Sequence, residues 1–322
     1  MSGARPASLD GLVGQLLGAR IVATEPARWG FSNRTELVTT ADGRRFAVAQ
    51  LGGGPLARHR VRVARLLPSL LDPAGIPTPR LVAVEPDGPT VVIITSFVTG
   101  TPGPELLADP ASALRLAGEM GRLTRRLRTV AAERCGPLAL GPGTGARAGL
   151  LRLPSAWADP RRLASLAGRW LHALGPELEP RTAAALADRL ANVPALFAGR
   201  PAVLAHGDWA PANVIVDRGR VAAVLDWEFA RLADPLFDVA WWGWVVAWHH
   251  PEVHRIAWPV FLEAAGVEPD PATAERLRSL VALRLLEAAA AARRAGNPVV
   301  AGAWTERLVQ TVGAGGEARA PR

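Results

Sequence analysis

The segment HGDWAPAN, residues 206–213, places a histidine, a carboxylate and an amide within one short stretch. It follows an apolar run at residues 202–205 and has the composition of a tight loop. In one interpretation, Asp208 and Asn213 only supply the local hydrogen bonds that a turn needs. In the other, they belong to a site that handles a proton and a metal ion. The segment that follows the loop helps to separate the two.

That segment, NVIVDRGRVAAVLD, has the alternation and the central turn of a β-hairpin. In the expected register Val216 pairs with Val221. Asn213 then lies opposite Val224, and Asp226 follows two residues later at the same open end. Opposite residues of an antiparallel ladder are about 5 Å apart. We therefore expect Asn213 and Asp226 to bind one small cation together.

Carboxylate and amide oxygens suit a hard cation such as Mg²⁺, which takes its other ligands from water and substrate phosphates. A further carboxylate facing those phosphates can orient or deprotonate an attacking hydroxyl group, as in phosphoryl transfer. His-x-Asp-x4-Asn is also the spacing of the kinase catalytic loop, and it occurs here from His206 to Asn213. We predict Asp208 as the catalytic base and Asn213 with Asp226 as metal ligands. A histidine such as His206 is more often a hydrogen-bonded core residue, so we assign it structural support.

Residues 203–240 resemble the core of the aminoglycoside phosphotransferase and choline kinase family. Residues 29–46 are similar to the phosphate-covering hairpin of that family, and residues 91–100 to its hinge strand. The resemblance implies an α+β, two-lobed, protein-kinase-like fold with a small antiparallel-sheet lobe, one main helix in it, and a larger helical lobe. It also implies Mg²⁺ and ATP or GTP bound between the lobes, with the base against hinge backbone near Ser96 and Val98.

The resemblance gives a role to Asp238 as well. The helix expected after Pro235 is apolar on all sides, so it should be buried. A buried carboxylate needs hydrogen-bonding partners. In the family this aspartate braces the catalytic loop, and we assign the same structural support to Asp238.

The sequence departs from the kinase pattern on the third strand. Kinases carry a lysine there that holds the α- and β-phosphates, whereas Ala49 takes its place and the chain contains no lysine. The helix expected at residues 55–71 has no acidic partner for such a lysine. One interpretation is that an arginine of this helix supplies the charge, with Arg62 the first choice and Arg58 the second. The other is a protein that binds nucleotide without chemistry, but the intact base and metal ligands favour an enzyme.

The loop that would cover the phosphates is also poor in glycine. Residues 29–33 contain one glycine rather than the three of a kinase loop. Ser32 and Asn33 could still donate hydrogen bonds to a phosphate, and Ala47 would line the nucleotide pocket.

The elements that must position these residues divide the chain in two. Apolar periodicity and turn signals predict helices at residues 8–18 and 55–71 and strands at 20–26, 35–40, 45–51, 80–86 and 90–97. From residue 110 onward the pattern is mainly helical, apart from the hairpin. We expect a nucleotide-binding lobe at residues 1–97, a helical lobe with the catalytic loop and the substrate site at 98–312, and a disordered tail at 313–322.

The composition favours a soluble, cytoplasmic protein. The chain of 322 residues has one cysteine, no secretory signal pattern, and no apolar run longer than residues 239–248. Such a run is too short to span a bilayer as a helix. The densest arginine cluster, at residues 122–128, lacks the interleaved aromatic residues of a nucleic-acid surface. We therefore expect no membrane or nucleic-acid partner, while the oligomeric state is not indicated.

The net charge of +8 disfavours a polycationic substrate, because the field of the protein would repel it. Trp209 and Glu228 adjoin the catalytic motif and are our candidates for substrate contacts. Most of the later tryptophans are expected in the core. A neutral or weakly charged hydroxylated antibiotic, inactivated by O-phosphorylation, fits best. A choline- or homoserine-type metabolite kinase is the near alternative, and a nucleotide-binding pseudokinase is the alternative from another class.

Overall fold

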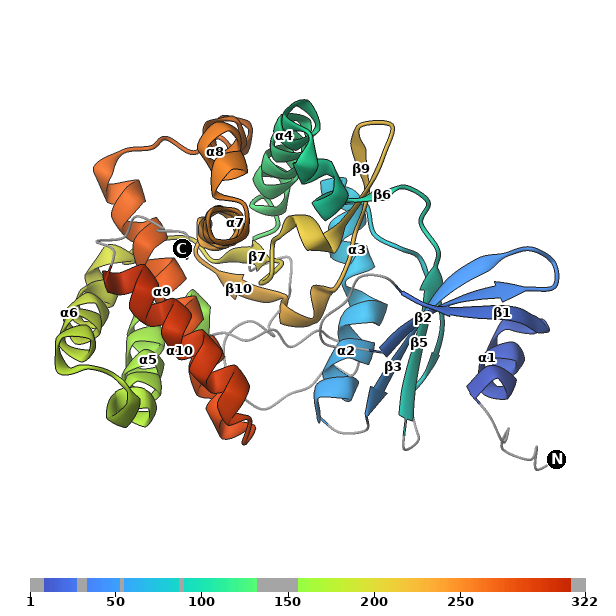
Figure 1. Cartoon of the computed structure of the whole chain (residues 1–322), viewed down its shortest axis with the longest axis horizontal. Coiled ribbons are helices and arrows are strands. Elements are labelled where there is room, and N and C mark those ends of the chain that lie inside the picture. The colour runs from blue at the N-terminus through green and yellow to red at the C-terminus, as the bar shows by residue number, and fades with distance from the viewer. Residues whose placement is uncertain (1–8, 28–33, 53–54, 87–89, 132–155, 314–322) are drawn as a thin grey trace.

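The computed structural model describes residues 9–27, 34–52, 55–86, 90–131 and 156–313. Figure 1 shows two lobes, with the N-terminal sheet on the right of the view and the helices of the second half of the chain on the left. The two-lobed α+β architecture predicted from the sequence is confirmed.

The N-terminal lobe is built on a five-stranded antiparallel sheet in the order β1-β2-β3-β5-β4. Its strands are β1 (Ile21–Pro26), β2 (Arg34–Thr40), β3 (Arg45–Gly52), β4 (Leu81–Glu85) and β5 (Thr90–Ser96). Successive side chains of a strand point to opposite faces. Phe46 and Val48 of β3 therefore pack with α1 (Leu9–Leu17), while Ala49 and Leu51 pack with α2 (Pro55–Leu66). The expected strands and main helix are all present.

The second lobe is mostly helical. Its helices, after the short α3 (Pro68–Leu71), are α4 (Pro110–Leu127), α5 (Pro160–Leu174), α6 (Pro180–Leu196), α7 (Phe237–His249), α8 (Pro251–Ala265), α9 (Pro271–Arg294) and α10 (Pro298–Gly313). Short strands interrupt them: β6 (Thr101–Pro102), β7 (Val203–Ala205), β8 (Val214–Asp217), β9 (Arg220–Val224) and β10 (Arg231–Ala233). Strand β7 pairs with β10, and β8 pairs with β6 and β9, so these strands present the loops that follow β7 and β9.

Asp-Pro pairs mark the beginning of α4, α5 and α9. The side chains of Asp109, Asp159 and Asp270 accept hydrogen bonds from main-chain amides of the first turn. Proline fits the first helical position because the amide that it lacks would have no partner within the helix. These caps set the point at which each helix begins.

A continuous hydrophobic core fills the helical lobe and extends into α2 and α3 through Val63, Leu67 and Leu71. Helix α7 is buried along most of its length, as expected from its apolar sequence, and Trp241 and Trp242 are at most 3% exposed. The tryptophans of this helix are therefore core residues. No helix in the described part of the chain is both long and apolar enough to cross a membrane.

The proposed domain limits stay a prediction. Strand β5 ends at Ser96, close to the expected boundary, and the chain pairs with the second lobe from Thr101 onward. Helix α10 ends at Gly313, and the rest of the expected tail lies outside the described residues.

Candidate active site

The hairpin forms with a register that differs by one residue from the predicted one. Val216 pairs with Val221 as expected, but a bulge follows and Val214 pairs with Val224. The amide of Leu225 then donates to the carbonyl of Asn213 at 2.8 Å. The expected pairing of Asn213 with Val224 was therefore wrong, because a bulge places two residues against one and shifts the ladder. Asn213 lies nearer to the end of the hairpin that leads into Asp226.

Asp208 is held at both carboxylate oxygens. The indole Nε1 of Trp241 donates to Oδ1 at 2.7 Å, and the amide Nδ2 of Asn213 donates to Oδ2 at 3.0 Å. The same Asn213 nitrogen also donates to the main-chain carbonyl of Asp208 at 2.8 Å. Because both of these acceptors face the nitrogen, the amide oxygen of Asn213 points elsewhere and is available to a metal ion. The predicted neighbours Asp208 and Asn213 thus lie together.

Asp238 and His206 shape the main chain of the loop. Asp238, 4% exposed, accepts hydrogen bonds from the amides of His206 at 2.7 Å and Gly207 at 3.0 Å. Nδ1 of His206 accepts from the amide of Asp208 at 3.2 Å, so Nε2 carries the proton and donates to the carbonyl of Leu225 at 2.8 Å. Both side chains therefore support the loop that carries Asp208.

Gly207 is required where the chain turns after β7. Its φ of +88° lies in the left-handed region, and an added Cβ would lie 2.0 Å from the carbonyl oxygen of Phe229. Only glycine can adopt this conformation without displacing the segment after Asp226.

Asp226 follows β9 in a left-handed conformation, with φ 54° and ψ 62°. Aspartate tolerates this region better than most residues because its side chain is short and polar. Its side chain is accessible to solvent. Desolvation by the surrounding protein raises the pKa of this carboxyl, and the charge of Arg60 acts in the opposite direction.

Arg60 was not predicted from the sequence. It projects from α2 and forms an ion pair with Glu228 in the 3-10 turn η8 (Trp227–Phe229). The predicted arginines Arg62 and Arg58 lie on the exposed side of the same helix. The sequence pattern could have identified Arg60 as an inward-facing residue, because position 60 falls on the same helix face as Ala57 and Val61, which pack against the sheet.

Three other residues that were predicted to contact substrate or nucleotide are engaged within the protein. Trp209 is wholly buried, so the expectation that it contacts substrate was wrong. Glu228 was expected to contact the acceptor substrate, but its carboxylate forms an ion pair with Arg60. In the hinge, the amide and hydroxyl groups of Ser96 bond the main chain of Arg80.

Four further residues were predicted to contact the nucleotide. Ala47 and Val98 are half-buried, and their assignment to the nucleotide pocket stays a prediction. Ser32 and Asn33 lie outside the described residues.

A buried ionic network lies behind the catalytic loop. Glu287 of α9 receives two hydrogen bonds from Arg231, at 2.7 and 3.0 Å, and one from the indole of Trp157 at 3.1 Å. Arg284, one turn earlier, contacts Glu287 at 3.4 Å and lies 5.1 Å from the ring centre of Trp241. The surroundings of Asp208 are therefore basic and aromatic.

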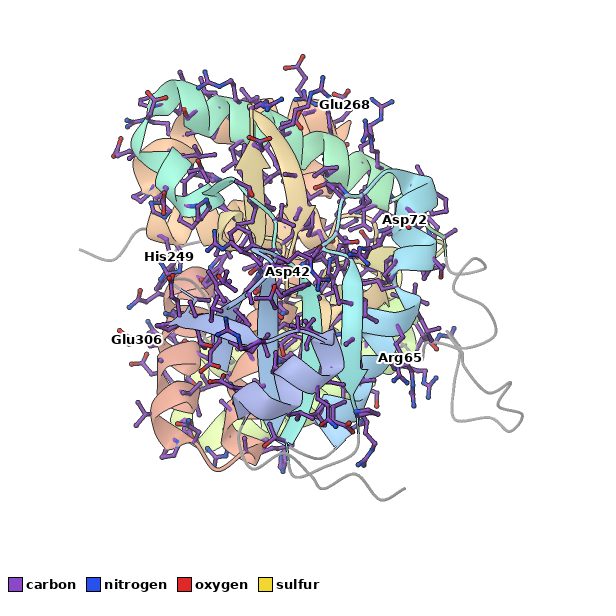
Figure 2. All side chains as sticks on the ribbon, turned by 90° about the vertical axis from the view of Figure 1, so that its right-hand side faces the viewer. Asp42, Arg65, Asp72, His249, Glu268 and Glu306 are labelled. Atoms are coloured by element: carbon purple, nitrogen blue, oxygen red, sulfur yellow. The ribbon has the colours of Figure 1, made fainter. Side chains whose placement is uncertain are left out.

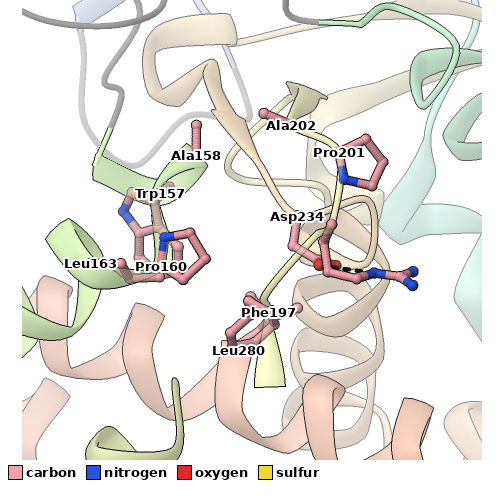
Figure 3. Close-up of a pocket in the computed structure, with 10 residues that line it drawn as sticks. Trp157, Ala158, Pro160, Leu163, Phe197, Pro201, Ala202, Asp234 and Leu280 are labelled. Atoms are coloured by element: carbon pink, nitrogen blue, oxygen red, sulfur yellow. Dashed lines mark ion pairs between the residues drawn. The ribbon is translucent and has the colours of Figure 1, made fainter. Parts of the chain in front are cut away.

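A small hollow at the other end of β7 is not the site of this chemistry. Its walls are mostly apolar and include Trp157, Phe197 and Leu280, and the carboxylate of Asp234 faces Arg200 at 3.9 Å (Figure 3). Neither Asp208 nor Asp226 lines it.

The residues present fit a magnesium ion better than a zinc ion. Within the described residues no group of three or more histidine, cysteine or acidic side chains converges to form a closed metal cage. Asn213 and Asp226 offer an amide oxygen and a carboxylate, and Mg²⁺ completes such a set with water and phosphate oxygens.

A small antiparallel-sheet lobe, a helical lobe and an aspartate held by an asparagine five residues later define a kinase-like phosphotransferase. Residues 23–277 match the model of the phosphotransferase enzyme family, and the chain belongs to this family. It is accordingly a nucleotide-dependent enzyme that phosphorylates hydroxyl groups of small molecules. No curated protein gives a significant match to the sequence.

Solved structures share the fold along nearly the whole chain. The macrolide 2'-phosphotransferase MphH from Brachybacterium faecium is 21% identical, with a TM-score of 0.65 over 94% of this chain and 98% of that one. A thermostable mutant of aminoglycoside phosphotransferase APH(4)-Ia, in complex with ADP and hygromycin B, is 18% identical, with a TM-score of 0.67 over 96% and 99%. The GDP complex of aminoglycoside 2'-phosphotransferase-IIIa is 16% identical, with a TM-score of 0.70 over 94% and 97%.

Proposed function

We propose that this enzyme transfers the γ-phosphate of ATP or GTP to a hydroxyl group of an antibiotic and thereby inactivates it. The observation that carries the mechanism is the fixed carboxylate of Asp208, with one oxygen bonded by Trp241 and the other by Asn213. A carboxylate held in this way can receive a proton without reorienting.

In this mechanism the acceptor oxygen forms a bond to the γ-phosphorus while the bond from that phosphorus to the bridging oxygen breaks. Asp208 takes the proton of the acceptor hydroxyl, and the nucleoside diphosphate leaves. Asn213 and Asp226 would hold Mg²⁺, which would neutralise part of the phosphate charge. Asp238 and His206 keep the loop in place through main-chain hydrogen bonds.

Two observations support a neutral or weakly charged antibiotic as the acceptor. The chain carries a net charge of +8, and the guanidinium group of Arg284 lies behind Asp208. A polycation would be repelled by both. Solved structures of this fold include a macrolide phosphotransferase as well as aminoglycoside phosphotransferases, so the fold serves chemically different antibiotics.

A metabolite kinase is the second candidate. The putative fructosamine-3-kinase from Thermobifida fusca has the same fold, with 18% identity and a TM-score of 0.61 over 95% of this chain and 98% of that one. An acceptor of this kind would use the same base and metal ligands.

The test is turnover of ATP and GTP over a panel of macrolide, aminoglycoside, nucleoside and peptide antibiotics, with choline, homoserine and fructosamines alongside. We expect nucleoside diphosphate and a phosphorylated product with an antibiotic, and neither with the Asp208→Asn variant. Turnover with a metabolite alone would assign the second candidate. Nucleotide binding without turnover of any acceptor would indicate a pseudokinase.

A further inference from the structure

We propose that Arg60 contacts the nucleotide phosphates in place of the absent strand lysine, and that Glu228 is the positioning residue that holds its guanidinium group. The inference rests on the proposed function, because it concerns the nucleotide that this function requires.

Arg60 is the arginine of α2 that faces the other lobe. It is 9% exposed, whereas Arg58, Arg62 and Arg65 of the same helix are exposed. In Figure 2, Arg65 lies at the outer edge of the molecule. Helix α2 packs beside η8, and this contact brings Arg60 to Glu228, whose side chain is 5% exposed.

The guanidinium group has unused hydrogen-bonding capacity. It carries five N–H donors, and its buried Nε has no hydrogen-bond partner among the described residues. A carboxylate such as Glu228 engages at most two of these donors in a fork. The terminal N–H groups that Glu228 does not engage could bind phosphate oxygens, because the planar fork of arginine matches a phosphate group.

The position of Arg60 fits the phosphates for two reasons. Its charge acts on Asp226, the proposed metal ligand, so phosphates bridged by that metal would lie beside it. Ala49, which stands where kinases have the lysine, packs in the same apolar cluster as Ala57 and Val61 of α2. The positive charge that kinases place on the strand would thus be supplied here by Arg60 of α2, the helix that packs against Ala49 of β3.

The charge balance of the site also calls for a cation. Asp208, Asp226 and Glu228 gather three carboxylates where a polyanionic nucleotide must bind. Like charges gathered in a partly buried site repel one another. Arg60 offsets one of them, Arg284 lies behind Asp208, and a bound Mg²⁺ would offset the rest.

The experiment compares the parent with the double variant Arg60→Met/Glu228→Gln, which removes both partners of the buried ion pair and leaves neither charge unpaired. Glu228→Gln keeps Arg60 but removes the residue that positions it. Arg62→Met, on the exposed side of the helix, is the matched control. Calorimetry measures the affinity for a non-hydrolysable nucleoside triphosphate and for the free nucleoside, each with Mg²⁺ and with EDTA.

We expect the double variant to bind the triphosphate about 10- to 100-fold more weakly than the parent, with and without Mg²⁺, because a charge-assisted contact is lost. The affinity of Glu228→Gln should lie between those of the parent and the double variant. Affinity for the free nucleoside should be unchanged, and Arg62→Met should match the parent. Equal triphosphate affinity in the parent and in the double variant would overturn the proposal. An equal loss for the free nucleoside would also overturn it, because Arg60 would then act only on the structure. Failure of the proposed function has a different signature, which is a parent enzyme that phosphorylates no acceptor.

Discussion

The indole Nε1 of Trp241 donates a 2.7 Å hydrogen bond to Oδ1 of Asp208. Asp208, the proposed catalytic base, is therefore anchored to helix α7, which is buried in the core, as well as to its own loop. Such an anchor limits the rotation of the carboxylate before substrate arrives.

Trp241→Phe should lower kcat by about 10-fold or more while leaving the nucleotide affinity and KM for nucleotide near the parent values. The reason is that a hydrogen bond to a charged acceptor contributes about 1.5–3 kcal/mol, and this one orients the base alone. Steady-state kinetics measure kcat and KM, and nucleotide titration measures the nucleotide affinity. Trp244→Phe is the control, because its indole bonds Thr311 at 3.0 Å instead. A rise in KM with unchanged kcat would contradict the assignment.

Asp208→Ala should reduce phosphoryl transfer by about 10²- to 10⁴-fold, the usual contribution of general base catalysis. Nucleotide binding should persist, because Asp208 faces the acceptor hydroxyl. Single-turnover assays and calorimetry give the two quantities. Turnover near that of the parent would remove Asp208 from the mechanism.

Asp226→Ala should abolish the Mg²⁺-dependent part of nucleotide binding, and Asn213→Ala should weaken it. Both residues lie at the open end of the hairpin, and both carry side-chain oxygens of the kind that Mg²⁺ takes as ligands. Nucleotide titrations across a range of Mg²⁺ concentrations measure the effect. A crystal structure of the nucleotide complex with magnesium on other side chains would show the assignment to be incorrect.

Glu287→Gln should lower the free energy of unfolding by about 3–5 kcal/mol near neutral pH, because it leaves buried Arg231 without its counter-ion. Burial would raise the pKa of Glu287, but Arg231 and Arg284 outweigh it and the net shift is below the ordinary value of 4.5. The folded pKa is thus the lower one. The stabilisation is complete above pH 4.5 and is lost as pH falls through the folded value.

Urea unfolding of the parent and the Glu287→Gln variant at neutral pH and at about pH 3 tests this dependence. The difference between the two proteins should shrink in acid. Glu275→Gln is the control, because its ion pair with Arg278 is exposed and such pairs contribute about 0–1 kcal/mol. A difference that is the same at both pH values would argue against the charged pairing.

The sequence was informative where structure is set by neighbours in the chain. Apolar alternation predicted the strand at residues 45–51, and the spacing from His206 to Asn213 predicted that Asp208 and Asn213 belong to the same site. Both depend on backbone geometry over a few residues.

Long-range features could not be predicted in the same way. Helical spacing shows that Arg58, Arg62 and Arg65 share a face, but packing against the sheet and η8 decided that Arg60 turns inward. The bond from Trp241 to Asp208 joins residues 33 positions apart, and no local pattern encodes it. The bulge in β9 likewise depends on packing of the hairpin in the fold.

The alanine at position 49 has a practical consequence for finding this enzyme in a mixture of proteins. Acyl-phosphate probes derived from nucleotides react with the ε-amino group of a lysine in the phosphate site, and the chain has no lysine at all. Such lysine-directed probes would therefore fail to label this enzyme at a lysine even if they bind its nucleotide site. Dicarbonyl reagents, which modify guanidinium groups, would label exposed arginines such as Arg62 instead, while Arg60 is buried against Glu228 and should be protected in the folded enzyme.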